Sequence, residues 1–192
     1  MATPTIDISH NSRVAAARAA RADGEGLRYR LDVVASSPAD VVQSAGGFLY
    51  DRVMAGWQVN VLLPHGCDTR PLRILGVRAL DPQAAAAAAG STTHSLAVSA
   101  EAFTADARVR DKVLECLDDR LTEVALWGDG WPLVVDRAMT RAQHVLSAAA
   151  RRFKGHALAA AEIDCDTVDP TETLLCDNVS RLPVDSGLIP LD

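Results

Sequence analysis

The chain has 192 residues, 48% of them hydrophobic but only 4% aromatic, and a formal net charge of −6 at pH 7. This length suits one domain with its own hydrophobic core. The negative charge argues against nucleic acid or an anionic membrane as a partner, and no apolar run reaches the ~20 residues needed to span a membrane.

The cysteines and the first residues indicate the compartment. Cys67, Cys116, Cys165 and Cys176 share no Cys-x-x-Cys spacing. The N-terminus lacks the basic and apolar pattern of an export signal. We therefore expect reduced thiols and a cytoplasmic protein. Residues 1–26 are small and polar, and we expect them to form a mobile N-terminal arm.

The first clear pattern in the chain is a strand, a helix and a second strand. Residues 27–35 end in an apolar run typical of a buried strand, and so do residues 57–63. Between them, Ser37 and Pro38 are a preferred N-cap and first helical residue, and Asp40 suits the positive end of a helix. Two strands joined by such a helix are expected to pair in parallel.

Gly46 and Gly47 interrupt this predicted helix, where each glycine costs about 1 kcal/mol relative to alanine. One interpretation is a close approach of the helix to the sheet or to a neighbouring helix. Another is a kinked helix, or a ligand that contacts the backbone here. The pair is too little for a dinucleotide fingerprint, because the second strand ends in Leu-Leu-Pro instead of the acidic residue that holds a ribose.

This order of strand, loop with Pro and Asp, Gly-Gly, helix and strand resembles the opening unit of the LmbE-like N-acetylglucosaminyl deacetylases. Their Ala-His-Pro-Asp-Asp motif supplies a zinc ligand pair and a catalytic base. The matching residues here are Ser36, Ser37, Pro38, Ala39 and Asp40. Ser37 replaces the ligand histidine and Ala39 replaces the base, so only Asp40 remains as a candidate ligand. The resemblance implies a shared α/β layout, and we expect no tightly bound zinc and no other cofactor.

The rest of the chain continues the alternation of strands and helices. Further strands are predicted over residues 95–99, 122–127 and 157–163, and helices over residues 81–89, from Thr104 or Asp106 onward, and over residues 133–153. We therefore expect a single Rossmann-like three-layer α/β domain over residues 27–163, with a mostly parallel sheet of four or five strands and helices on both faces. Residues 164–192 read as an extended, acidic and apolar tail that docks on its own domain or on a neighbouring subunit.

Three loops should open on the same edge of this sheet, because each follows a predicted parallel strand, and doubly wound folds bind their ligands at that edge. The candidate ligand-binding residues in these loops are Ser36, Ser37, Asp40, His65, Asp68, Thr69, Arg70 and Asp129. The helix start at Pro38 also favours an anion. The structural alternative is that Ser37 and Asp40 are helix caps and that the others are turn residues.

The sequence contains no catalytic or nucleotide-binding motif that we recognise. We therefore interpret the chain as a non-catalytic α/β module that binds a protein partner or a small anionic ligand and forms a homo-oligomer. The alternative is a hydrolase or transferase at the same edge of the sheet, with Asp40, His65, Asp68 and Asp129 as acid, base or metal-ligand candidates.

Overall fold

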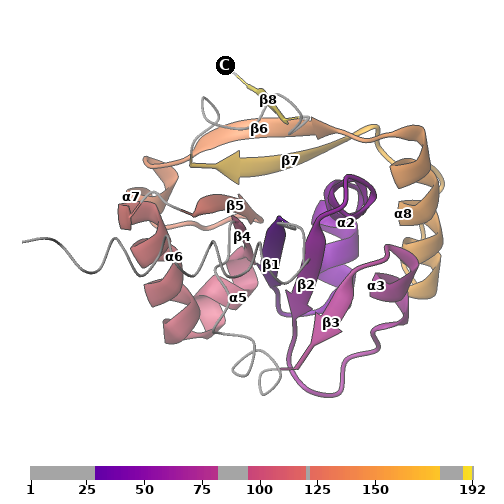
Figure 1. The fold of residues 1–192 in the computed structure, drawn as a ribbon, viewed down its shortest axis with the longest axis horizontal. Helices are drawn as coiled ribbons and strands as arrows, with labels where there is room; N and C mark the ends of the chain where they lie inside the picture. The colour runs from indigo at the N-terminus through magenta and orange to yellow at the C-terminus, as the bar shows by residue number, and fades with distance from the viewer. Residues whose placement is uncertain (1–28, 82–94, 120–121, 178–187, 192) are drawn as a thin grey trace, which may run out of the picture.

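The computed structural model describes residues 29–81, 95–119, 122–177 and 188–191, which form a mixed eight-stranded sheet with helices on both faces (Figure 1). The strands are β1 Arg30–Val34, β2 Gln58–Leu62, β3 Arg78–Leu80, β4 Ser95–Ser99, β5 Glu123–Trp127, β6 Thr140–Val145, β7 Thr171–Cys176 and β8 Leu188–Pro190. The helices are α2 Pro38–Met54, α3 Arg70–Ile74, α5 Ala100–Ala105, α6 Ala107–Asp119, α7 Leu133–Asp136 and α8 Ala148–Ala160.

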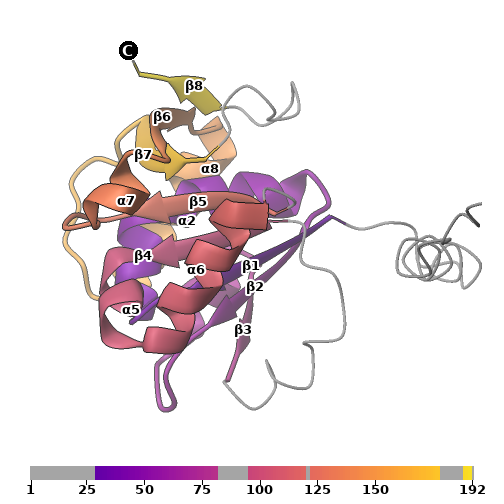
Figure 2. The same cartoon turned by 90° about the vertical axis from the view of Figure 1, so that its left-hand side faces the viewer.

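The strands lie in the order β3-β2-β1-β4-β5-β7-β6-β8. All neighbours from β3 to β5 are parallel, whereas β7 is antiparallel to both β5 and β6, and β8 is antiparallel to β6. Helices α2, α3 and α8 pack on one face, and α5, α6 and α7 lie on the other (Figures 1 and 2). Each face has its own buried apolar cluster.

The predicted β1-α2-β2 unit is confirmed. Leu31 pairs with Val59 and Val33 with Val61 in parallel register. Ser37 is the N-cap of α2, and its hydroxyl accepts the backbone N–H of Asp40 at 3.2 Å. The α/β class is therefore confirmed, but the predicted sheet of four or five mostly parallel strands is wrong. The reason is that the C-terminal third supplies three further strands that run antiparallel to their neighbours.

Two elements of that third differ from the sequence prediction. Residues 133–153, predicted as one helix, contain α7, β6 and the start of α8. In β6 the buried residues Ala142 and His144 alternate with more exposed ones, namely the exposed Arg141 and Val145 and the half-buried Gln143, which is the period of a strand. Residues 157–163, predicted as a strand, begin as the last turn of α8, where Leu158 packs into the core.

Strand β7 is an interior strand of the sheet, between β5 and β6. Its buried residues are Glu172, Leu174 and Cys176, so a carboxylate takes one of the core positions of this strand. The division of the chain at residues 26 and 163 stays a prediction. Residues 1–26 and most of the helix predicted over residues 81–89 lie outside the described residues. In the described part of the chain, no helix combines the length and the apolar character that crossing a membrane requires.

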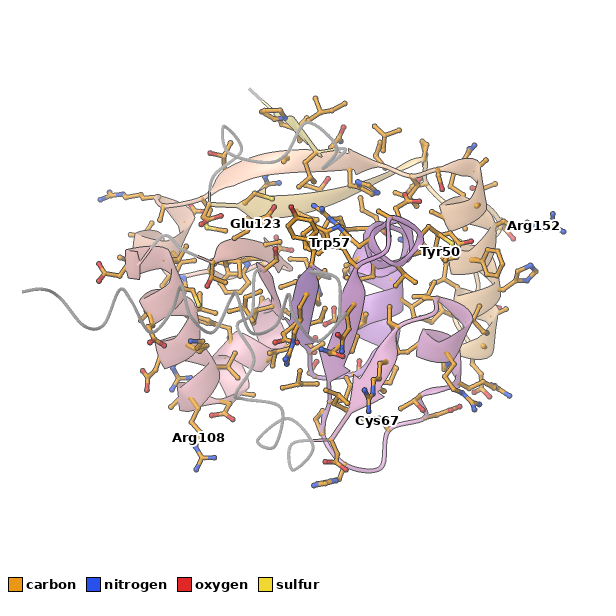
Figure 3. All side chains as sticks on the ribbon, viewed as in Figure 1. Tyr50, Trp57, Cys67, Arg108, Glu123 and Arg152 are labelled. Atoms are coloured by element: carbon orange, nitrogen blue, oxygen red, sulfur yellow. The ribbon has the colours of Figure 1, made fainter. Side chains whose placement is uncertain are left out.

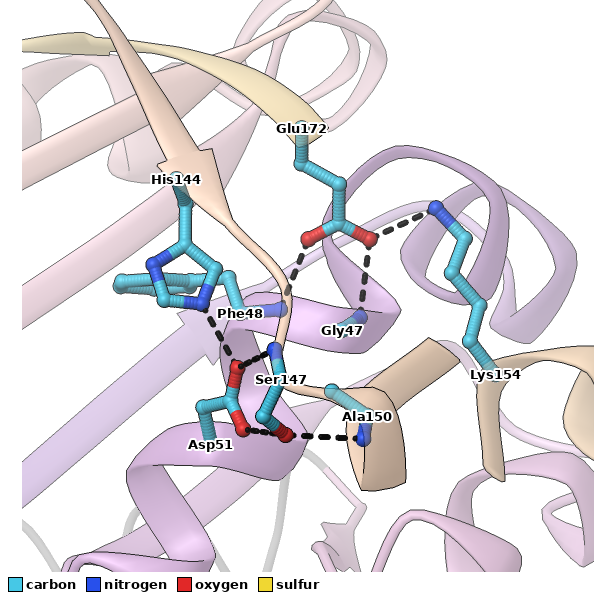
Figure 4. A network of polar contacts seen from close by, with 8 residues as sticks. All are labelled: Gly47, Phe48, Asp51, His144, Ser147, Ala150, Lys154 and Glu172. Carbon is cyan, nitrogen blue, oxygen red and sulfur yellow. Dashed lines mark hydrogen bonds and ion pairs between the residues drawn. The ribbon is translucent and has the colours of Figure 1, made fainter. Parts of the chain in front are cut away.

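Glu172 of β7 and Lys154 of α8 form an ion pair that contacts the backbone in the middle of α2 (Figure 4). The Glu172 carboxylate accepts the backbone N–H groups of Gly47 at 2.8 Å and Phe48 at 2.7 Å. Lys154 Nζ donates to Glu172 at 2.6 Å and to the carbonyl of Gln43 at 2.8 Å. In an uninterrupted helix the N–H of residue 47 bonds to the carbonyl of residue 43. The ion pair thus bonds to the N–H of Gly47 and to the carbonyl of Gln43, the two groups that one helical hydrogen bond would join. It also links α2 to β7 and α8.

The two glycines of α2 have different surroundings. A Cβ on Gly47 would lie 2.2 Å from Cδ2 of Leu146, whereas a Cβ on Gly46 would lie 3.4 Å from the nearest atom, in Leu75. The close approach predicted for this pair is therefore confirmed at Gly47. The group that contacts the helix backbone here is the Glu172 carboxylate.

A second polar network joins the end of α2 to β6 and α8 (Figure 4). Asp51 accepts a hydrogen bond from the Ser147 hydroxyl at 2.6 Å and lies 2.9 Å from His144 Nε2. The same hydroxyl accepts the N–H of Ala150, so Ser147 is also the N-cap of α8. Asp51 therefore fixes the start of α8 relative to α2.

Arg52 is a buried cation on the same helix, with a relative exposure of 6%. Its guanidinium lies 4.4 Å from the centroid of the Trp57 ring and 3.9 Å from Glu123, two residues labelled near the centre of Figure 3. Burial lowers the pKa of Arg52, and Glu123 opposes this effect. By contrast, Arg108 and Arg152 project outward at opposite sides of the molecule (Figure 3).

Candidate functional site

A cleft of about 590 Å³ lies at the carboxyl ends of the parallel strands β4 and β5, beside the start of α2. Its lining consists of Asp40, Ser99, Ala100, Glu101, Thr104, Ala105, Trp127, Gly128 and Asp129. The carboxyl edge of a parallel sheet is where α/β proteins bind their ligands, because successive loops and helix starts converge there. The cleft is therefore our candidate site.

Asp40 is held in this cleft by residues from two elements. Trp127 Nε1 at the end of β5 donates to Asp40 Oδ1 at 3.0 Å, and the Ser44 hydroxyl, one turn further along α2, donates to the same oxygen at 3.3 Å. The other oxygen, Oδ2, is buried and has no hydrogen-bond partner within the described residues. A buried acceptor without a donor is costly, and such groups in native proteins call for an explanation.

Burial raises the pKa of the Asp40 carboxyl above its usual 3.8, and the neighbouring Glu101 carboxylate raises it further. The hydrogen bond from Trp127 opposes both effects most strongly, and the nearby hydroxyl groups of Ser99 and Ser44 act in the same direction. Asp40 therefore keeps its proton to a higher pH than an ordinary aspartate. Acids whose pKa is shifted in this direction are suited to proton transfer.

Glu101 is the second carboxylate of the cleft, and it comes from α5. This helix starts directly after β4, with Ser99 as its N-cap, and the Ser99 hydroxyl accepts the N–H of Ala102 at 3.1 Å. Glu101 is exposed on the first turn, and the Ser36 hydroxyl donates a hydrogen bond to its Oε2. Ser36 thus links the end of β1 to the start of α5.

The structure brings together part of the predicted residue set. Asp40 and Asp129 line the cleft, Ser36 bonds to Glu101, and Ser37 caps the helix that carries Asp40. The remaining four candidates follow β2 and line neither described cleft: His65, Asp68, Thr69 and Arg70. The role of all eight as ligand-binding residues stays a prediction.

The residues after β2 make contacts of a structural kind. Asp68 accepts the N–H of Arg70 at 2.9 Å, as in a turn, and Arg70 donates to the carbonyl of Ala160 at the end of α8 at 3.0 Å. His65 is exposed on the loop. These contacts fit the turn alternative for His65 and Asp68.

Glu101, Ser99 and Trp127 are part of the site but were not among the residues predicted from the sequence. A signal was available for the first two, because residues 95–99 were predicted as a strand and Glu101 follows its carboxyl end. Trp127 ends the next predicted strand, but a tryptophan in that position is more often a core residue, and its relative exposure is 2%.

A second cleft, of about 440 Å³, shares Trp127 and Gly128 with the first. Its other walls come from α2, α8, β7 and the loop before β7, and they include Lys154, Asp164 and Asp169. Trp127 and Gly128 therefore border both clefts.

No family model and no curated protein matches this sequence. Solved structures do match its fold. The antimicrobial reagent A40926 pseudoaglycone deacetylase has a TM-score of 0.51 at 14% identity over 77% of this chain and 96% of its own. A deacetylase in complex with teicoplanin has a TM-score of 0.53 at 12% identity, and the zinc-inhibited form of teicoplanin deacetylase has 0.52 at 12%. Each of these two comparisons covers 85% of this chain and 99% of the deacetylase.

At this level of identity the likeness establishes the fold. It nevertheless overturns the interpretation of the chain as a non-catalytic binding module, because the structural neighbours are deacetylases. That interpretation rested on the missing sequence motifs. A site assembled from Asp40 and Glu101, 61 positions apart in the numbering, leaves no local motif to find.

Proposed function

We propose that this protein is a hydrolase that cleaves the amide bond of an acylated amine in the cleft between α2, β4 and β5. The observation that carries this proposal is the carboxyl pair of Asp40 and Glu101. Asp40 has one oxygen fixed by Trp127 and one buried oxygen without a partner in the described residues, and Glu101 is exposed in the same cleft. The deacetylase fold of the structural neighbours supports the same reaction class.

The pair divides the roles of acid and base. The Glu101 carboxylate accepts a proton from a water molecule, whose oxygen attacks the carbonyl carbon of the amide. Asp40, whose pKa is raised by burial and by the nearby Glu101, donates the proton of its acid form to the leaving nitrogen. The C–N bond breaks, a C–O bond forms, and the products are a carboxylic acid and an amine. One protonated and one ionised carboxyl group are an established way to obtain both functions in one site.

The resemblance to zinc deacetylases raises the question of whether this cleft fits zinc. Its potential ligands are the carboxylates of Asp40, Glu101 and Asp129 and two hydroxyl groups, with no histidine or cysteine. Protein zinc sites are built mainly from histidine and cysteine. Within the described residues, no group of three His, Cys, Asp or Glu side chains is placed to hold a metal ion. The residues therefore do not fit zinc, and we derive no step through it.

Acetate release from a panel of N-acetyl amines tests the proposal. General acid–base groups contribute roughly 10²–10⁴-fold to rate, so Asp40→Asn and Glu101→Gln should each lower kcat by about 100-fold or more. The matched control is Asp118→Asn, which removes an exposed carboxylate of α6 that lines neither cleft. Equal activity in all four proteins would refute the assignment.

A separate measurement tests the expectation that the protein binds no zinc. Elemental analysis of the purified protein should find well under one zinc per chain, and a chelator should leave acetate release unchanged. Close to one zinc per chain, lost in Asp40→Asn, would contradict this prediction. The predicted homo-oligomer stays a proposal, and light scattering of the purified protein measures it directly.

A further inference from the structure

We infer that the substrate of this site carries a positive charge a few bonds from the amide, as a mono-acylated diamine does. This inference rests on the proposed function and adds a substrate class to it. Two features lead to it: the sign of the charges in the two clefts, and the engagement of the one cation in their described lining.

The described lining of the first cleft contains carboxylates and no cation. Glu101 and Asp129 are both exposed there, and the Trp127 indole that bonds to Asp40 lines the same cleft. Asp129 has no hydrogen bond or ion pair within the described part of the chain. A cleft lined by one sign of charge concentrates ligands of the opposite sign and raises their association rate by roughly 10–10³-fold.

The second cleft extends the same charge beyond Trp127. Asp164 and Asp169 are exposed on its rim. Lys154 is the one basic residue in its described lining, and its side chain is 8% exposed. The Lys154 ammonium is already bound to Glu172 at 2.6 Å and to the carbonyl of Gln43 at 2.8 Å. It is therefore committed to the ion pair and offers little attraction to an anionic substrate.

The start of α2 does not reverse this preference. A helix N-terminus is equivalent to roughly +0.5 of a charge, which is less than the two exposed carboxylates of Glu101 and Asp129. The backbone N–H of Asp40 in the first turn is also occupied, because it donates to the Ser37 hydroxyl. The sequence analysis expected a small anionic ligand. A preference for the anion in the experiment below would support that expectation and contradict this inference.

Three N-acetyl substrates of equal chain length test the inference. They carry, at the far end of a four-carbon chain, an ammonium group, a hydroxyl group or a carboxylate. At low ionic strength kcat/KM should be about tenfold higher for the cation than for the neutral compound, and lower again for the anion. In 0.5 M salt the differences should shrink, because exposed charges are then screened within a few ångströms.

Two variants locate the effect. Asp129→Asn and the double variant Asp164→Asn/Asp169→Asn should each reduce the preference for the cation at least about twofold, and Asp118→Asn should keep it. Equal kcat/KM for the three substrates, or a preference for the anion, would overturn the inference and leave the hydrolase assignment intact.

Calorimetric titration with the free diamine separates the two proposals. If none of the substrates is hydrolysed but the diamine binds, and Asp129→Asn weakens that binding, the hydrolase assignment fails and the charge preference stands. If the protein hydrolyses the neutral substrate and the diamine neither binds nor competes, the charge preference fails alone.

Discussion

The indole N–H of Trp127 donates to Oδ1 of Asp40 at 3.0 Å across 87 positions of sequence. Trp127 has a relative exposure of 2%, and it lines both clefts at the carboxyl edge of the sheet. This bond stabilises the ionised form of Asp40, and among the hydrogen bonds that do so it has the largest effect on the pKa. One side chain therefore helps to position the acid and also lowers its pKa against the larger effect of burial.

Replacing Trp127 by Phe should raise the pKa of Asp40, because it removes the strongest opposition to burial. As Asp40 acts in its protonated form, the alkaline limb of the pH–rate profile should move to higher pH. The loss of a hydrogen bond to a carboxylate should also cost about 1–3 kcal/mol of unfolding free energy. Trp131→Phe is the matched control, since Trp131 Nε1 donates to the carbonyl of Gly128 at the same distance of 3.0 Å. A profile that moves equally in both variants would contradict the role of Trp127.

Asp40→Asn should leave the protein at least as stable as the parent at pH 7. The pKa of Asp40 is raised in the folded state, so between pH 3.8 and that raised value the unfolded chain has already released a proton that the folded chain keeps. Stability from this group therefore falls as the pH rises through that window. Thermal melting at pH 3 and pH 7 measures the effect, and the advantage of the variant should be present only at pH 7. A variant that melts lower at pH 7 than at pH 3, relative to the parent, would disprove it.

Lys154→Met should be strongly destabilising, by about 3–5 kcal/mol, because it leaves the Glu172 carboxylate buried without its cation. The side chain of Glu172 is 1% exposed. The double variant Lys154→Met/Glu172→Gln should lose less, since the neutral amide can still accept an N–H of α2 and donate to the carbonyl of Gln43. Chemical denaturation of both variants measures the difference. If the double variant is the less stable one, the carboxylate is not the source of the cost.

Gly47→Ala should destabilise the fold by about 1–3 kcal/mol, because the new methyl group would overlap Leu146 in a packed core. Gly46→Ala is the matched control on the adjacent residue, where the new Cβ would meet Leu75 at 3.4 Å. It should be neutral or stabilise the helix by up to about 1 kcal/mol. Similar melting temperatures for the two variants would show that the contact with Leu146 relaxes freely.

Deleting residues 180–192 should lower the melting temperature, because it removes β8 and its pairing with β6. A loss of about 1–2 kcal/mol corresponds to about 2–8 °C for a domain of this size. Deletion from residue 171 onward should prevent folding, since it removes the interior strand β7. Light scattering should accompany both, as a tail docked on a second subunit would also change the mass. Unchanged melting and unchanged mass after the shorter deletion would show that the tail contributes nothing.

The sequence predicted the first half of the fold because its local signals agree with its tertiary contacts. Ser37 and Pro38 begin α2, and residues 95–99 form β4 as expected. The second half failed where a tertiary contact outweighs the local pattern. Residues 139, 142, 146, 149 and 153 have helical spacing, yet the pairing of β6 with β7 places Ala142 and His144 in the core of a strand. In β7 the buried Glu172 breaks the apolar alternation by which a strand is recognised.

The candidate site was predictable only where its residues follow a strand that the sequence itself predicts. Asp40 and Asp129 were found because parallel strands bring their loops to one edge. Glu101 was missed because it lies in a helix that continues directly from β4, without the loop residues that mark the other candidates. The free oxygen of Asp40 depends on where Trp127 and Ser44 point, which spacing along the chain does not specify.

The ion pair within α2 has a consequence for the order of assembly during synthesis. The backbone N–H of Gly47 is bonded to a carboxylate 125 positions later in the chain. While a ribosome is making the protein, the helix that carries Asp40 is complete long before its partner Glu172 exists. Contacts over such sequence distances form late and slow folding. The nascent chain should therefore remain inactive until residue 172 has left the exit tunnel. Asp40 and its cleft should reach their final arrangement only when β7 joins the sheet.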